Sequence, residues 1–125
     1  MYGRRIAFPT GVCSAGGDLT LTLTTPLNGL LECIEYVPAA SNALATGADI
    51  VVAGTQFATP AIVSRLNIGT VAFRVYPRTP VHAVADGVAI AGLADKIALA
   101  DELVSIVIAQ GGNATASGQW YAVLT

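Results

Sequence analysis

Alternation of apolar and polar residues with a period of two is the main pattern along this chain. Between residues 18 and 25, Leu19, Leu21 and Leu23 alternate with polar residues, mostly threonines. This pattern predicts a β-strand with one buried face and one face toward solvent. Turn-forming residues recur about every 8–12 positions, the spacing typical of β-sandwiches and jelly rolls. The sequence therefore predicts an all-β fold, an antiparallel β-sandwich or jelly roll.

Two runs near the end of the sequence, residues 103–109 and 119–124, are apolar at positions of both parities. Their β-branched residues favour strands over helices. The loop between them is rich in glycine and carries no charge, which predicts a long hairpin connection between the two strands. A strand that is apolar on both sides is buried on both sides. We therefore expect the domain's own core to cover one face and a neighbouring molecule to cover the other.

Turn signals separate the remaining expected strands. Asn28-Gly29 predicts a hairpin turn after the strand at 18–25, and Pro77 with Pro80 predicts a break without ladder pairing on either side. Residues 93–102 fit a helix, through apolar residues at helical spacing, or a short strand and turn, and we favour the strand. The other expected strands span residues 30–37, 50–53, 61–68 (with Pro60 at its start), 70–76, 81–85 and 87–91.

Residues 1–17 show no sustained period and are interrupted by Pro9 and several glycines. They predict an extended N-terminal arm with at most one short strand at residues 4–8, ahead of a β-sandwich domain at 18–125. Fully extended, the arm could reach about 55–60 Å. It could lie across its own domain, lace into a neighbouring subunit, or fray. Its candidate contact residues are Arg4, Arg5, Phe8 and Cys13.

The composition indicates an assembled protein. The length of 125 residues suits one domain. Charged residues make up 11% of the chain, against about 25% in ordinary soluble domains. Hydrophobic residues make up 54% and aromatic residues only 6%, so most of the hydrophobic residues are Ala, Val, Leu and Ile. Permanent assembly would cover such a surface, because obligate interfaces are apolar; a surface rich in Ala and Thr that stays soluble alone is the alternative.

Charge and hydropathy predict neither nucleic-acid binding nor membrane contact. The net charge is −2, and the six basic residues are scattered without a basic run. The apolar segment after Arg4-Arg5 stops at Pro9, too early for a secretory signal, and no apolar run is long enough to span a membrane. We expect synthesis in the cytoplasm.

The chemistry-bearing residues predict no catalytic, metal or cofactor site. Cys13 and Cys33 lack the spacing and the histidine partners of a metal site. We expect Cys33 to be a small core residue and Cys13 to be exposed, with a disulfide between them as a less favoured alternative. His82, the single histidine, lies in an apolar strand, and no serine has nucleophile-elbow spacing. We expect no enzyme and no small-molecule ligand.

Two groups are candidates for interface residues. Trp120 and Tyr121 are adjacent and point to opposite faces, so one could anchor an interface or stack on a sugar; packing of both inside the sandwich is the alternative. The second group surrounds the proline-rich break and could pair with acidic residues of a neighbouring subunit, or form a solvated rim. Its members are Arg74, Tyr76, Arg78 and His82. Glu32 and Glu35 are expected to edge an interface.

The order of strands and turns resembles a family. The resemblance rests on Ile34-Glu35-Tyr36-Val37-Pro38, Gly47-Ala48-Asp49-Ile50-Val51-Val52, Pro77-Arg78-Thr79-Pro80-Val81-His82, Leu99-Ala100-Asp101-Glu102-Leu103 and the glycine-rich loop 111–118. Across residues 18–125 this arrangement looks like small virion structural proteins of tailed bacteriophages, of the head decoration (cement) or head-auxiliary type.

That resemblance implies a non-enzymatic β-sandwich, often trimeric, that sits on the capsid surface and binds copies of itself and the major capsid protein. It implies no catalytic residues, and the N-terminal arm with Cys13 has no counterpart in the pattern. Two other functions remain open at this point. One is a tail, neck or fibre-attachment component of a virion, and the other is a carbohydrate-binding sandwich that uses Trp120 or Tyr121 as a stacking platform.

Overall fold

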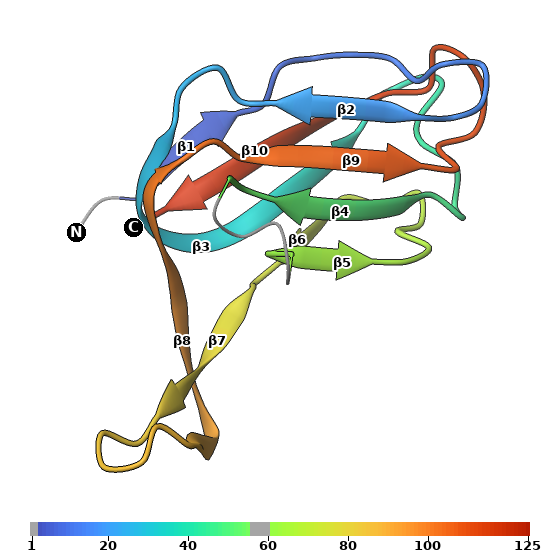
Figure 1. Ribbon diagram of the computed structural model, residues 1–125. Coiled ribbons are helices and arrows are strands. Elements are labelled where there is room, and N and C mark those ends of the chain that lie inside the picture. The colour runs from blue at the N-terminus through green and yellow to red at the C-terminus, as the bar shows by residue number, and fades with distance from the viewer. Residues whose placement is uncertain (1–2, 56–60) are drawn as a thin grey trace.

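The structure, a computed structural model, describes residues 3–55 and 61–125. Their strands form two antiparallel sheets packed face to face, which confirms the predicted all-β fold and is consistent with a sandwich (Figure 1). The strands are β1 (Arg4–Ala7), β2 (Leu19–Thr22), β3 (Leu27–Pro38), β4 (Asp49–Ala53), β5 (Val63–Arg65), β6 (Phe73–Val75), β7 (Arg78–His82), β8 (Ala89–Glu102), β9 (Ser105–Ala109) and β10 (Gly118–Leu124).

The two sheets enclose one apolar core. The larger sheet has the order β1-β10-β3-β8-β7, with β6 also paired to β3, and the smaller sheet has the order β2-β9-β4-β5. Trp120 and Tyr36 fill the centre on the larger sheet, with their ring centroids 4.5 Å apart. The smaller sheet contributes Ile50, Ile106 and Ile108, all almost fully buried. Alternate positions of each strand thus supply the core, as the period of two requires.

The loop between β9 and β10 crosses from one sheet to the other, so the predicted hairpin is wrong. β9 pairs with β2 and β4, whereas β10 pairs with β1 and β3. Both strands must present an apolar face to the same core, and they do so from opposite layers. The loop itself is held by the backbone of the N-terminal segment, where the amide of Gly111 donates to the carbonyl of Gly17 (2.8 Å).

The Asn28-Gly29 dipeptide forms an irregularity inside β3 rather than the predicted turn. β3 runs through it, and its register with β8 shifts between Leu27 and Gly29. Gly29 has a φ of 126°, and the side-chain carbonyl of Asn28 accepts a hydrogen bond from the amide of Asp101 (2.8 Å). The same residues that suit a tight turn therefore serve a β-bulge, while β2 pairs in the other sheet.

The proline-rich break also differs from the prediction. Pro80 lies within β7, opposite Ala94 of β8, and only Pro77 stays outside a strand. A proline is tolerated here because β7 is an edge strand, paired on one side only. Residues 93–102 belong to the long strand β8, which confirms the strand interpretation over the helix. β8 and β7 replace the two short strands predicted at 81–85 and 87–91.

The described part of residues 1–17 lies along its own domain. β1 pairs with β10, and the amide of Phe8 donates to the carbonyl of Trp120 (2.9 Å). Phe8 and Cys13 are buried in the core. The prediction that Cys13 is exposed is therefore wrong. β5 and β6 are shorter than the strands predicted at 61–68 and 70–76, and Pro60 lies outside the described residues.

Candidate assembly surfaces

A β-hairpin made of β7 and β8 projects from the sandwich, and its far half has no core beneath it (Figure 1). At its base Ile97 and Leu99 of β8 are buried in the domain. Beyond the base, every residue from Ala89 to Asp95 is exposed. Four large apolar side chains of this far half face solvent: Val84, Val88, Ile90 and Leu93. We call residues 79–95 the hairpin arm.

The tip of the hairpin arm is a defined turn. The amide of Ala83 donates to the carbonyl of Val88 (2.8 Å), and the amide of Gly87 donates to the carbonyl of Ala83 (2.9 Å). Oδ1 of Asp86 accepts from the amide of Val88 (3.0 Å), and Gly87 takes a φ of 72°. The hairpin arm contains Asp86 and Asp95 but no Lys or Arg. It is therefore an apolar ribbon with an acidic tip.

The outer face of the larger sheet carries the opposite charge. Glu35 of β3 lies under two guanidinium groups, with Arg5 Nε at 2.8 Å from one carboxylate oxygen and Arg74 Nε at 2.6 Å from the other. The Glu35 side chain is only 8% exposed, whereas Arg5 and Arg74 are more than half exposed. The hydrogen bond from Arg74, and next that from Arg5, lower the pKa of Glu35 against the opposing effect of burial.

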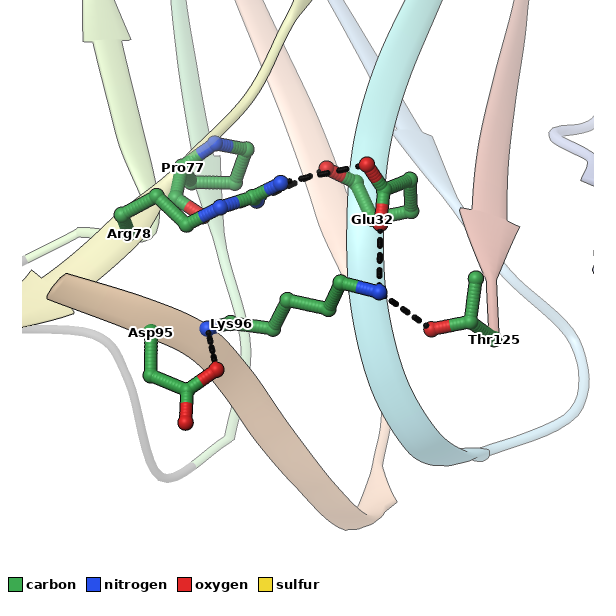
Figure 2. Close-up of polar contacts among 6 residues, drawn as sticks. All are labelled: Glu32, Pro77, Arg78, Asp95, Lys96 and Thr125. Atoms are coloured by element: carbon green, nitrogen blue, oxygen red, sulfur yellow. Dashed lines mark hydrogen bonds and ion pairs between the residues drawn. The ribbon is translucent and has the colours of Figure 1, made fainter.

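A second carboxylate on the same face gathers two more cations. Figure 2 shows Arg78 of β7 and Lys96 of β8 converging on Glu32 of β3, with distances of 3.1 Å to Arg78 Nη2 and 2.7 Å to Lys96 Nζ. Lys96 Nζ also donates to Thr125 Oγ1 (3.1 Å). The hydrogen bond from Lys96 is the largest effect that lowers the pKa of Glu32. These pairs tie the base of the hairpin arm to β3.

Folding therefore concentrates charge that is dispersed along the sequence. Four of the six Lys and Arg residues, Arg5, Arg74, Arg78 and Lys96, pair with Glu32 and Glu35 on this face, so this cluster has a formal charge of +2 in a chain of net charge −2. Part of the cluster borders a hollow of about 580 Å³, the basic hollow. Its lining residues are Gly3, Arg4, Arg5, Glu32, Cys33, Glu35, Arg74, Tyr76 and Val123.

The outer face of the smaller sheet is uncharged in its centre. Thr20, Val107, Val51 and Ser64 lie opposite one another across its four strands. Val107 and Val51 are exposed, so the second apolar face predicted for β9 is real and is not covered within this chain. The surface offers a flat, uncharged area of the kind that a partner can cover.

The structure corrects several of the residue predictions. Trp120 has no exposed surface and packs against Tyr36 and Phe73, so it cannot stack on a sugar or anchor an interface. Tyr121 is half-buried on the outer face, with the guanidinium of Arg5 3.6 Å from its ring centroid. The alternative that packs both aromatic rings inside the sandwich holds for Trp120 only.

Arg74 and Arg78 pair with glutamates of their own chain, and their pairing with acids of a neighbouring subunit stays a prediction. Tyr76 is exposed beside Arg78, and His82 is exposed on the hairpin arm. The sequence analysis missed that Glu32 and Glu35 are the partners. Strict alternation along β3 would place Glu32 and Glu35 on opposite faces, and the register shift against β10 brings both to the outer face. Only Glu35 has its partner Arg74 directly opposite in the ladder.

Both cysteines are free and buried, which contradicts a disulfide between them. Cys33 is buried, as predicted for a small core residue. It lies outside the main cluster and lines the basic hollow, and burial raises the pKa of its thiol. Among the described residues, no group of three or more His, Cys, Asp or Glu side chains could hold a metal ion. In the same part of the chain, no helix is long and apolar enough to cross a membrane.

Comparison with protein-family models, with curated proteins and with solved structures gave no match to this chain.

Proposed function

We propose that this chain is a structural assembly subunit that binds copies of itself and coats a larger protein shell. The exposed apolar hairpin arm is the observation that carries the proposal. Val84, Val88, Ile90 and Leu93 project into solvent on a ribbon with no core beneath it. Fully burying one such side chain contributes about 1.5–3 kcal/mol, so an arm of this kind gains most of its stability from a partner.

The physics of small β-structures supports the same conclusion. An isolated two-stranded hairpin is marginally stable in water, and the far half of this one lacks a packing layer within the chain. A projecting apolar ribbon that met no partner would be an aggregation hazard. Docking against another molecule removes both costs.

The shell that we propose is a phage capsid. The low charge content, the uncharged outer face around Val51 and Val107 and the resemblance to head decoration proteins support a protein on the capsid surface. Its partners would be its own copies and the major capsid protein. Catalysis, nucleic acid and cofactors have no part in this function. A place at the tail or neck is the alternative, and imaging labelled protein on virions separates the two locations.

Shortening the hairpin arm tests the proposal. Thr79 and Asp95 face each other in the ladder, so an Asn-Gly turn can replace residues 80–94 and leave the base intact. We expect the full chain to form a discrete oligomer by light scattering, and the shortened chain to be a folded monomer with a nearly unchanged melting temperature. Val71→Ser, which removes an exposed apolar side chain off the arm, is the control and should assemble normally. A full chain that is strictly monomeric and does not bind empty capsid shells contradicts the proposal.

A further inference from the structure

The charges of the hairpin arm and of the basic hollow are opposite, and the two surfaces lie at different ends of one structure. The base of the arm contributes Arg78 and Lys96 to the positively charged face (Figure 2), while Asp86 lies in the turn at the tip. Because the arm projects away from the sheet (Figure 1), its tip is held apart from the hollow of its own chain.

We propose that the arm tip of one copy docks in the basic hollow of the next copy, with the carboxylate of Asp86 held by arginine side chains. This inference rests on the proposed function, since it names the partner of the hairpin arm. The occupant is a second copy of this chain, and the ligand chemistry is a carboxylate flanked by apolar side chains.

The hollow retains donors for such a carboxylate. Each guanidinium has five N–H donors. Arg5 and Arg74 give Nε to Glu35, and Arg74 also bonds the side chain of Tyr76, so each keeps further N–H donors. Arg4 at the rim uses Nη2 for the carbonyl of Asn28 (2.9 Å). Pairing with a carboxylate by two parallel hydrogen bonds suits the remaining guanidinium edges.

The tip carries the complementary groups. Oδ1 of Asp86 is used within the turn, and no other polar contact of Asp86 exists among the described residues. Val84 and Val88 flank it and are exposed. Tyr76 and Val123 in the lining of the hollow offer apolar surface next to the arginines. Opposite charge steers the encounter, and the apolar pairs contribute to affinity.

Tip and hollow are different surfaces, so two arrangements use the same contact. If each copy gives its tip to one neighbour and receives a tip from another, the contact closes into a ring or continues as a chain. If two copies exchange tips reciprocally, they form a closed two-fold dimer.

Charge reversal tests the contact. Asp86→Arg and Arg4→Glu should each raise the dissociation constant of self-association at least about tenfold, measured by sedimentation over a concentration series. The matched controls are Asp18→Arg and Arg65→Glu, which change the net charge equally outside the tip and the hollow, and they should assemble like the wild type. Combining Asp86→Arg with Arg4→Glu in one chain restores an attractive pair and should recover part of the affinity.

A mixing experiment fixes the direction of the contact. The shortened chain described above has a hollow but no tip, and Arg4→Glu has a tip but a weakened hollow. Mixed together, they should form a one-to-one complex that grows no further, while each alone stays monomeric. If the shortened chain is monomeric but Asp86→Arg and Arg4→Glu assemble like the wild type, the arm docks elsewhere and this inference is wrong, although the proposed function stands. A monomeric wild type overturns this inference, and it overturns the proposed function as well if it does not bind empty capsid shells.

Discussion

At the scale of single residues, one buried carboxylate organises the outer face of the larger sheet. Glu35 is 6% exposed and accepts hydrogen bonds from two arginines that reach it from β1 and β6. A buried charge is tolerated when its hydrogen-bonding capacity is filled. The arginines stay half exposed, so they remain solvated on the side away from Glu35. One residue thus links three strands.

Glu35→Gln should lower the free energy of unfolding by about 1 kcal/mol near neutral pH, a modest value because both partners face solvent. The folded-state pKa of Glu35 is lowered. Its contribution is therefore fully present above the ordinary pKa of a glutamate and is lost as the pH falls through the folded-state pKa. Urea unfolding at several pH values should show the two proteins converge in acid. Asp18→Asn, at an exposed acid, is the control and should track the wild type throughout.

Two adjacent aromatic residues should respond very differently to truncation. Trp120→Ala empties the centre of the core and should cost about 3–5 kcal/mol, whereas Tyr121→Ala removes a half-buried ring and its contact with Arg5 and should cost about 1 kcal/mol. Chemical denaturation compares the variants. If Trp120→Ala does not fold, Trp120→Phe should still show a loss larger than that of Tyr121→Ala. Equal losses at the two positions would contradict the assignment of Trp120 to the core.

At the scale of elements, the ends and irregularities of the long strands decide how the two sheets are joined. β3 and β8 are the longest strands, and each serves two environments: β3 pairs with β10, β6 and β8, while β8 leaves the sandwich to form the hairpin arm. The bulge at Gly29 adjusts the register where β3 meets β8. A strand that changes surroundings along its length needs such an adjustment.

Gly29→Ala should destabilise the protein by about 1–2 kcal/mol, because its φ of 126° is strained for a residue with a Cβ. The nearest atom to an added Cβ is the carbonyl oxygen of Thr125 at 3.7 Å, so the cost comes from the backbone and not from a clash. Gly16→Ala is the matched control, since its φ is not in the left-handed region and its nearest contact is ordinary. Thermal unfolding measures both. A Gly29→Ala protein as stable as the control would contradict the strained bulge.

At the scale of the whole molecule, the separation of charge is the feature with the largest consequence. The outer face of the larger sheet is positive, and the hairpin arm is negative and apolar. Few charges are present in total, so positive charge on the sheet and negative charge on the arm make the charge distribution of the molecule asymmetric. This separation would steer the proposed encounter between the tip of one copy and the hollow of another.

Raising the ionic strength from about 0.05 M to about 0.5 M should weaken self-association, because salt screens the attraction between tip and hollow. Complete dissociation is not expected, since burial of Val84 and Val88 is insensitive to screening. Light scattering at matched protein concentrations follows the change. The Asp86→Arg protein should show the reverse dependence, with association improving as salt screens the repulsion it creates. Association of the wild type that strengthens with salt would indicate a purely apolar contact.

The sequence by itself determined that the chain is all-β and located most of its strands. Leu19, Leu21 and Leu23 alternate with polar residues, and alternation of side chains across a strand is a local property of the backbone. The same reasoning correctly favoured a strand at 93–102. For the candidate surfaces, the sequence indicated exposed apolar strands and low charge, and it placed Arg74 and Arg78 near a structural break.

Only the tertiary structure decided which strands are neighbours and which charges meet. Asn28-Gly29 suits a turn and a bulge equally, and the choice depends on β8, which lies far away in the sequence. Which of Trp120 and Tyr121 is buried depends on which face of β10 meets the core. Arg5, Arg74 and Glu35 come together from three separate strands. Strand formation follows local sterics. Strand pairing and side-chain burial depend instead on how the whole chain packs one core.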